Sequence, residues 1–416
     1  MDMDTASVLA LGLGVGPPWR LVNQRLDTSK QPHILEIFLE TDRGALFACP
    51  ECGRSCKAHD FKEFTWRHLN FFQHHCLITA KIPRASCQEH GVKRVDVPWA
   101  REGSGFTVLF EQAAMTLVRE MPVLAVARII GITDKRLWRV VAHYVARAVG
   151  KLELSGLGSL AFDETAAKRG HNYVTVFIDA NLKNRPVVFA TPGKGKATVR
   201  EFKAFLKEHD GVPERVVEVV CDMSPAFLAA IGEEFPGANV TVDWFHVVQL
   251  FTRAVDNVRK AEYKRVPMPV ATRWAVLKAA DGRLTDKQAA ALVELEAGDF
   301  LTAVAWRIKE KLRWVRQAET PNAARWRLTH FLRHATAQIG DSPMFEAVRK
   351  ALDTVKKHQS RILERWTTSR SNARMEALNG LFQAARARAR GYRNTATFIL
   401  MIYLIAAPLR NMFNST

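Results

Sequence analysis

The sequence lacks any apolar run long enough to cross a membrane. Its longest, FILMIYLIAA from Phe398, is about half of the roughly 20 residues that a spanning helix needs, so it predicts a buried helix instead. The first residues, MDMDTASVLALGLGVG, are acidic and lack the positive segment that begins a secretory signal peptide. These absences argue against a membrane-embedded or secreted protein, and we expect a cytoplasmic one without a membrane partner.

Acidic residues are also scarce relative to basic ones. The chain has 60 Lys and Arg against 42 Asp and Glu, which gives a formal net charge of +18. A surplus of this size indicates a polyanionic partner, and nucleic acid is the leading candidate. The rival, a protein that binds an anionic membrane surface, has no apolar segment to support it.

The organisation of the chain is predicted from changes in hydrophobic period, because no repeat and no low-complexity linker divides it. Before residue 100 the pattern is strand-like, as in HILEIFLET and again from Phe61 to Cys87, where Cys76, Ile78, Ala80 and Ile82 are expected on one face. It becomes helical from Phe106 to about residue 150. From 159 to 242 strands alternate with helices, which predicts a mixed α/β sheet. From His246 to about Trp366 nearly everything is helical.

The six cysteines of a cytoplasmic protein are better explained as metal ligands or core residues than as disulfides. Two motifs, CPECG and CQEHG, each end in a glycine that lets the backbone fold over a metal. The predicted ligands of a structural zinc ion are Cys49, Cys52, Cys87 and His90. The alternative ligands that the sequence leaves open are Cys56, His59 and His68. Cys76 and Cys221 are predicted to be core residues.

The helical run predicts a helix-turn-helix, whose second helix enters the major groove of DNA. Pro122 fits the first position of a helix, Gly131 a tight turn, and Thr133 the N-cap of the helix DKRLWRVVAHYV. The residues expected on the exposed face of that helix are Lys135, Arg136 and Arg139, and those expected inside are Leu137, Val140 and Val141. A three-helix core without DNA contacts would have the same pattern, and the positive charge of the chain favours DNA.

Two aspartates are predicted at the ends of core strands. Asp163 ends the first strand of the α/β segment, and Asp222, in RVVEVVCDMSPAF, ends the fourth. The fourth strand is expected to include Val216, Val217, Val219 and Val220. If these strands are neighbours, both carboxylates lie at the same edge of the sheet and repel each other unless a cation lies between them. Two magnesium or manganese ions, about 3.5 to 4 Å apart, would relieve that repulsion and suit phosphodiester chemistry. For either aspartate alone, a helix cap or a turn residue is the alternative.

A third carboxylate is then expected from a later helix, and Glu376 is the best candidate. Three polar residues share its helical face, and these are Asn372, Asn379 and Gln383. Three apolar residues form another face, and these are Met375, Leu378 and Phe382. We therefore expect Glu376 to join the two aspartates.

A lysine-rich segment, GKGKAT, begins at Gly193. It lacks the glycine spacing and the Ser or Thr of an ATP-binding loop, so it predicts a strand-to-helix turn. Lys194 and Lys196 are expected to contact DNA phosphates there.

Together these blocks resemble the DDE transposases of bacterial insertion sequences, in the family called ISL3, over nearly the whole chain. FDETAAKRGHNYVTVFID is similar to the block around the family's first catalytic Asp, here Asp163. VVCDMSPAF resembles the second, here Asp222, and SNARMEALNGLFQAARARARGYRN the block with the catalytic Glu, here Glu376. DWFHVVQL is similar to the segment after the fifth strand, which places Asp243 and His246 near the site. CPECG and CQEHG resemble the family's zinc finger, with a His where the last Cys is more usual.

The resemblance implies a multidomain α+β protein whose ribonuclease-H-like α/β catalytic core is interrupted by a large helical insertion. The implied parts are a β-rich zinc-finger module at 1–100, a helix-turn-helix domain at 101–152, the first part of the core at 153–246, the insertion at 247–366 and the last helices of the core at 367–416. The implied activity is metal-dependent DNA cleavage and strand transfer at the terminal inverted repeats of a mobile element. The implied metal ligands are Asp163, Asp222 and Glu376.

Further expectations follow from this resemblance. Asn372 and Asn379 are expected beside the acids, as are Asp243 and His246. The basic residues expected along the DNA path, on the same helix as Glu376, are Arg374, Arg386, Arg388 and Arg390. A solvated basic face is the alternative for any one of them. The expected partners are double-stranded DNA, both the terminal repeats and the target, and a second copy of the chain that binds the same DNA. The expected location is the cytoplasm, in association with the nucleoid. Two rivals remain, a DNA-binding regulator without catalysis and a nuclease of the same fold that does not join DNA.

Overall fold

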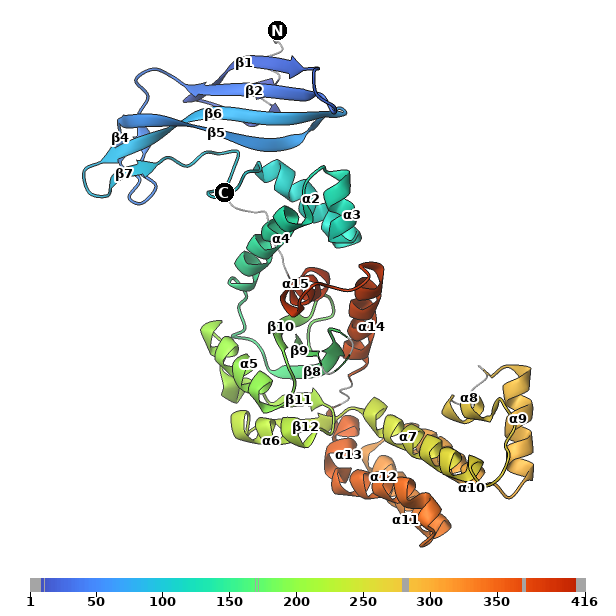
Figure 1. The fold of residues 1–416 in the computed structure, drawn as a ribbon. Coiled ribbons are helices and arrows are strands. Elements are labelled where there is room, and N and C mark those ends of the chain that lie inside the picture. The colour runs from blue at the N-terminus through green and yellow to red at the C-terminus, as the bar shows by residue number, and fades with distance from the viewer. Residues whose placement is uncertain are drawn as a thin grey trace. The chain divides into compact units, whose positions relative to one another are not determined.

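The computed structural model describes residues 9–10, 12–168, 170, 172–278, 284–368 and 372–408. They fall into two compact units that divide between His143 and Tyr144, within helix α4 (Asp134–Val149) (Figure 1). In these ranges no helix is both long and apolar enough to span a membrane.

The first unit is built on a five-stranded sheet in the order β1-β2-β6-β5, with β7 paired to β6. Its strands are β1 (Trp19–Asp27), β2 (Ile34–Thr41), β5 (Ala58–Phe71), β6 (His74–Cys87) and β7 (Gly91–Arg94). The predicted apolar face of β6 is confirmed, because Cys76, Ile78, Ala80 and Ile82 are each at most 1 % exposed. They pack in a core with Trp66, so Cys76 is a core residue as predicted.

Three helices complete the first unit, and they are α2 (Val108–Glu120), α3 (Val123–Ile129) and α4. Pro122 is the N-cap of α3 and not its first residue, because its ψ of 137° is not helical. Gly131 has a φ of +70°, as the predicted tight turn requires. Thr133 precedes α4, and its Oγ1 accepts a hydrogen bond from the N–H of Arg136 at 3.4 Å. The sequence therefore determines this turn through residues with special backbone roles.

The second unit contains a five-stranded sheet in the order β10-β9-β8-β11-β12. Its strands are β8 (Ser159–Ala166), β9 (Tyr173–Asp179), β10 (Val187–Pro192), β11 (Glu218–Cys221) and β12 (Asn239–Val242). Strands β8, β9 and β10 pair antiparallel, whereas β11 pairs parallel to both β8 and β12. The predicted mixed sheet and its order of strands and helices are confirmed.

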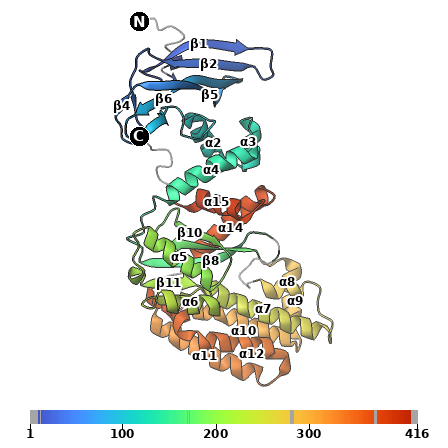
Figure 2. The ribbon, with the colours of Figure 1, turned by 60° about the vertical axis from the view of Figure 1, so that its left-hand side comes forward.

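Helices cover both faces of this sheet (Figure 2). They are α5 (Lys196–Glu208) and α6 (Pro225–Glu234) on one face, and α14 (Ala373–Arg388) and α15 (Thr395–Ala406) on the other. Phe162 of β8 is fully buried against Phe202 of α5 and Phe227 of α6. Because side chains alternate along a strand, its neighbour Asp163 faces the α14 side. The predicted buried C-terminal helix is α15, and the Tyr403 hydroxyl accepts a hydrogen bond from the N–H of Ala190 in β10 at 3.0 Å.

Two expectations about the strands were wrong. Strand β8 runs past Asp163 to Ala166, because this stretch still pairs with β9 on one side. The pairing that does end is the one with β11 on the other side, whose last β8 partner is Ala161. Strand β11 is also shorter than predicted: Val217 precedes it and is 52 % exposed, after the short helix η1 (Pro213–Arg215).

A group of helices follows β12, and the first of them, α7, begins at Trp244. Its helices are α7 (Trp244–Tyr263), α8 (Thr272–Leu277), α9 (Asp286–Ala297), α10 (Leu301–Arg316), α11 (Pro321–Ile339), η2 (Pro343–Phe345), α12 (Glu346–Lys357) and α13 (Gln359–Thr368). Glu262 near the end of α7 is buried and accepts hydrogen bonds from the N–H groups of Leu301 and Thr302 at 2.7 and 2.8 Å. Because these N–H groups begin α10 and have no partner within it, Glu262 fixes α10 to α7.

Candidate functional site

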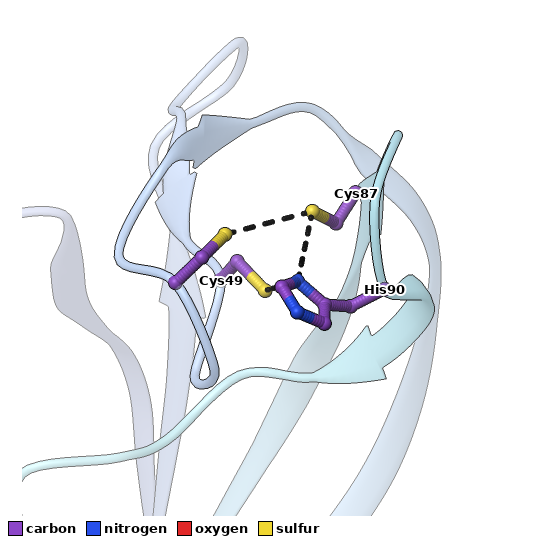
Figure 3. A group of neighbouring side chains, drawn as sticks. Cys49, Cys87 and His90 are labelled. Carbon is purple, nitrogen blue, oxygen red and sulfur yellow. Dashed lines mark hydrogen bonds between the residues drawn. The ribbon is translucent and has the colours of Figure 1, made fainter.

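The four predicted zinc ligands meet at one point of the first unit. Figure 3 labels three of them, Cys49, Cys87 and His90. The four ligands come from two knuckles. Cys49 and Cys52 lie between β3 (Phe47–Ala48) and β4 (Ser55–Cys56), whereas Cys87 ends β6 and His90 directly precedes β7. Their ligand atoms all lie within 4.8 Å of one another. Cys87 Sγ is 3.7 Å from both Cys52 Sγ and His90 Nδ1. A zinc tetrahedron with Zn–S bonds of about 2.3 Å has edges of about 3.7 Å, so the group has the size that zinc requires.

The backbone of both knuckles favours a bound cation. Gly53 and Gly91, which follow the ligand pairs, have φ of +71° and +69°, where glycine is strongly preferred. Backbone N–H groups of His90 and Glu89 point at Cys87 and lower the pKa of its thiol to about 6. The thiolate is the form that binds metals.

The three alternative ligands lie outside this cluster. His68 hydrogen-bonds Thr107 Oγ1 at 2.8 Å, and burial lowers the pKa of its imidazole to about 4. Cys56 donates to the carbonyl of Arg54 at 3.4 Å, and His59 is exposed. The structure therefore brings together the four ligands that the two motifs predicted.

The predicted DNA-contacting residues of α4 are all exposed, and they are Lys135, Arg136 and Arg139. On the opposite face Leu137, Val140 and Val141 are each at most 2 % exposed, as predicted. The Arg136 guanidinium lies 4.2 Å from the centroid of the Phe106 ring, which holds this arginine against the domain. The helix thus has an apolar face toward the core and a basic face toward solvent.

Asp163 and Asp222 lie near each other, just beyond the pairing of two neighbouring strands. The parallel pairing of β8 with β11 ends at Ala161 and Val220, two residues before Asp163 and Asp222, and burial and the Asp222 carboxylate both raise the pKa of Asp163. Asp222 lies just beyond β11, where its Oδ1 accepts a hydrogen bond from the N–H of Ser224 at 2.8 Å. The start of α6 therefore fixes the Asp222 carboxylate beside β8.

Helix α14 supplies the third acid. Glu376 is in its first turn, and Asn379, one turn further on, donates a hydrogen bond through Nδ2 to Asp163 Oδ2 at 2.9 Å. Gln383 donates to Thr165 Oγ1 at 2.8 Å, so the predicted polar face of α14 lies against β8. Asn372 is the N-cap of the helix and is buried. The apolar residues predicted to share another face of α14 are Met375, Leu378 and Phe382, and all three are buried.

Asp243 and His246 lie beside these acids, as the sequence predicted. Asp243 is the N-cap of α7 and accepts from the N–H of Phe245. His246 Nε2 is 3.9 Å from Asp163 Oδ1 and 4.0 Å from Asp243 Oδ2. Several buried atoms of this group have no hydrogen-bond partner within the described ranges, and they are Asp243 Oδ2, His246 Nε2, Asn379 Oδ1, and Oδ1 and Nδ2 of Asn372. Polar atoms buried in this way indicate a site built to hold a polar or ionic group.

The electrostatics of the group also favour a cation. Burial raises the pKa of Asp163, and the carboxylates of Asp222 and Glu376 raise it further, against the effect of His246. Burial likewise raises the pKa of Asp243 and of Glu376, each with a contribution from neighbouring acids. A divalent cation between these groups would favour their charged forms.

Three charged residues near the acids were missed from the sequence. Glu164 directly follows Asp163, and burial and the Asp222 carboxylate raise its pKa. Arg365 of α13 is half-buried, which lowers the pKa of its guanidinium, whereas Asp243 and Glu376 raise it. Arg316 lies at the end of α10, and its positive charge opposes the rise in the pKa of Glu376 that burial causes. Glu164 could have been predicted from the sequence because it adjoins Asp163. No sequence pattern indicated the two arginines, because only the folding of the helices after β12 brings them near the acids.

The basic residues predicted along the DNA path fall into different classes. Arg374 donates to the carbonyls of Ala180 and Leu182, and Arg386 to that of Ala166. These two arginines connect α14 to the sheet. Arg388 is exposed in the last turn of α14. The prediction that Arg390 lies on the same helix was wrong, because it follows α14 in a turn with a φ of +55°.

The lysine-rich segment is a strand-to-helix turn between β10 and α5, as predicted. Lys194 is exposed, and its Nζ lies 4.8 Å from the centroid of the Tyr173 ring. Its charge also acts on Glu164, so Lys194 lies near the acids. Lys196 forms an ion pair with Glu233 of α6 at 2.5 Å.

Comparison with known families gives three matches along the chain. Residues 160–402 match the DDE transposase family of the ISL3 type, described as a transposase. Residues 95–145 match the helix-turn-helix domain of transposase family ISL3. Residues 45–90 match the zinc-finger of transposases IS204, IS1001, IS1096 and IS1165.

Relatives with assigned functions are similar over different lengths. The transposase for insertion sequence element IS1001 of Bordetella parapertussis is 26 % identical over 390 residues, which are 91 % of this chain and 93 % of the relative. The transposase for insertion sequence element IS1557 of Mycobacterium tuberculosis is 31 % identical over 219 residues, which are 51 % of this chain and 48 % of the relative.

Proposed function

The chain belongs to the ISL3 family of transposases and is an enzyme that acts on DNA, and we propose that Asp163, Asp222 and Glu376 are its catalytic acids. The observation that supports the proposal is that the pairing of β8 with β11 brings the chain near Asp163 and Asp222 together, while Asn379 of the Glu376 helix donates a hydrogen bond to Asp163. Buried polar atoms that have no partner within the described ranges lie beside them. In this proposal the enzyme cleaves DNA at the terminal inverted repeats of its element and joins the freed end to target DNA.

The proposed catalytic core is ribonuclease-H-like. The support is its sheet, in which the first three strands are antiparallel and the fourth and fifth are parallel beside the first. We propose the same five parts as the sequence suggested, with the core at 153–246 and 367–416 and the insertion between them at 247–366. The zinc-finger module at 1–100 and the helix-turn-helix domain at 101–152 would bind the element's ends.

The residues present fit two kinds of metal. Three thiols and one imidazole suit zinc, so Cys49, Cys52, Cys87 and His90 would hold one structural ion with no open position for substrate. Carboxylate oxygens suit hard cations, so Asp163, Asp222 and Glu376 would hold two magnesium or manganese ions. When bound there, such ions would activate the attacking oxygen and stabilise the leaving oxygen of a phosphodiester.

The chain's own residues position these acids. Asn379 orients Asp163 by the hydrogen bond to Oδ2, and the N–H of Ser224 orients Asp222. His246 lies between Asp163 and Asp243, where it can balance the charge of either. Attack by water would free a 3′ hydroxyl at the element's end, and attack by that hydroxyl on target DNA would join the strands. No covalent bond between protein and DNA is required.

An assay with labelled terminal repeats, a target plasmid and magnesium tests the proposed reaction. Joined products are expected. Cleavage without joining would indicate a nuclease of the same fold, and binding without cleavage would indicate a regulator.

We also propose that the protein is a homodimer on DNA, because joining two ends requires two active sites. The proposed location is the cytoplasm, in association with the nucleoid.

Replacing Arg139 by Gln is expected to weaken binding to the terminal repeat and to DNA of other sequences by a similar factor. Arg139 is exposed, and an arginine that contacts a phosphate releases about one counterion from the DNA. In a plot of the logarithm of the binding constant against the logarithm of the salt concentration, the magnitude of the slope should therefore fall by about 1. Fluorescence anisotropy at several salt concentrations measures this slope. The control is Arg200→Gln on α5, outside both DNA-binding modules, where the guanidinium pairs with Glu233 and Glu234. It should leave the slope unchanged, and equal slopes in the two variants would contradict a DNA contact by Arg139.

Replacing Asn379 by Ala is expected to lower cleavage about 10- to 100-fold, because residues that orient metal ligands have effects of this size. A steady-state cleavage assay over a range of magnesium concentrations measures it, and the loss should shrink as magnesium rises. The comparison variant is Gln383→Ala on the same helix face, which contacts Thr165 but none of the acids. Equal losses in both variants would assign Asn379 to helix packing alone.

A further inference from the structure

A cavity of about 480 Å³ lies in the helical insertion, between the start of α7, the end of α8 and α10. Its lining includes aromatic, aliphatic and cationic side chains, among them Trp244, Phe245, Val248, Leu277, Arg313 and Arg316. This volume is typical of sites for small organic groups. Nothing in the zinc site, the helix-turn-helix or the proposed cleavage chemistry accounts for it.

Two of the helices that line the cavity, α7 and α10, also lie near the proposed catalytic acids. Trp244 and Phe245 directly follow Asp243, the N-cap of α7. Arg316 lines the cavity at the end of α10. The cavity therefore begins where the carboxylate cluster ends.

The lining has the chemistry of a nucleotide site. The Phe245 side chain is 48 % exposed, although it lies in the first turn of α7 beside a packed core, and its ring contacts His246 edge to face at 5.6 Å. Trp244, by contrast, is 3 % exposed and packs against Trp366. Phe245 is therefore the ring available for stacking, with apolar neighbours around it.

The charged side chains that line the cavity carry a net positive charge. Lys309 donates to the carbonyls of Val276 and Lys278 at 2.8 and 2.9 Å and pairs with Glu310 at 2.8 Å, so its ammonium has a structural role and offsets the one acid of the lining. The arginines at 313 and 316 add positive charge toward the side of the acids. A flat aromatic group that carries a phosphate matches both features.

We propose that this cavity receives one nucleotide that has been unstacked from the DNA end beside the cleaved phosphate. The base stacks on Phe245, and Arg316 contacts the adjoining phosphate. This inference rests on the proposed function and adds to it how the DNA end is held. Unstacking a base costs a few kcal/mol, and stacking on an aromatic side chain returns a comparable amount, so the exchange can hold a distorted end in place.

The test uses the full chain and terminal-repeat duplexes with 2-aminopurine placed at each position next to the cleavage site in turn. In the Asp222→Asn protein, binding should raise the fluorescence at one position, because the analogue brightens when it leaves the stack. Adding Phe245→Ala should remove this rise, whereas adding Phe245→Tyr, which keeps the ring, should retain it. The control is Trp326→Ala, an exposed aromatic residue of α11 outside the cavity.

Cleavage gives a second measurement. Phe245→Ala alone should cleave paired duplex about 10- to 100-fold more slowly than the wild type, and a mismatch at the same position should restore most of the rate, because the base is then already unpaired. If the wild type cleaves normally, no position brightens and Phe245→Ala cleaves like Trp326→Ala, the cavity does not bind a nucleotide and the proposed function stands. If the wild type cleaves no terminal repeat, both proposals are wrong.

Discussion

Asp222→Asn is expected to bind the terminal repeats as tightly as the wild type and to form neither cleaved nor joined product. The substitution keeps the size of the side chain and the acceptor for the Ser224 N–H, but removes the negative charge near Asp163. A metal-assisted step contributes several kcal/mol to transition-state stabilisation, so both products should fall by about 1000-fold or more. Gel assays of binding, cleavage and joining on one preparation measure the three properties.

The matched control is Asp256→Asn. This aspartate lies on α7 of the same unit and pairs with Arg259 and Lys260, so its loss removes a partly buried carboxylate outside the acidic cluster. It should cleave and join normally. An active Asp222→Asn variant would show that the acids have been assigned wrongly, whereas equal losses in both variants would indicate a general effect of removing acids from this unit.

Cys87→Ser is expected to lose bound zinc and to lower the unfolding temperature of the chain. Structural zinc contributes about 10 to 16 kcal/mol in isolated zinc fingers, where it replaces a hydrophobic core. Here the first unit has its own core around Trp66 and Ile78, so we expect the knuckles to lose their order while the sheet stays folded. Binding to the terminal repeat should fall with the loss of zinc. Metal analysis, thermal unfolding and anisotropy measure the three effects.

Cys56→Ser is the control for the zinc site. Its thiol is close in sequence to Cys52 but lies outside the group of four ligands. It should retain one zinc ion and unfold at the wild-type temperature. Loss of zinc from Cys56→Ser with retention in Cys87→Ser would overturn the ligand assignment.

Local pattern was enough to predict most elements of this protein. Glycines after CPECG and CQEHG, and Gly131 between α3 and α4, fix turns through the backbone conformations that only glycine adopts easily. The apolar faces of β6 and α4 follow from the periods of strand and helix. Where the prediction was wrong, at Asp163 and Val217, the end of a strand depended on its neighbour. Strand β8 continues because β9 pairs with it, and β11 begins only where β8 can pair.

The sequence by itself was enough to propose which residues carry the chemistry, because metal ligands, caps and acids near strand ends follow short-range spacings. Only the tertiary structure decided their surroundings. It separated the arginines that fix α14 to the sheet, Arg374 and Arg386, from the exposed Arg388. It also brought Arg316 and Arg365, distant along the chain, to the acids. The physical reason is that spacing along one element is fixed by backbone geometry, whereas contacts between elements depend on how their buried faces pack together.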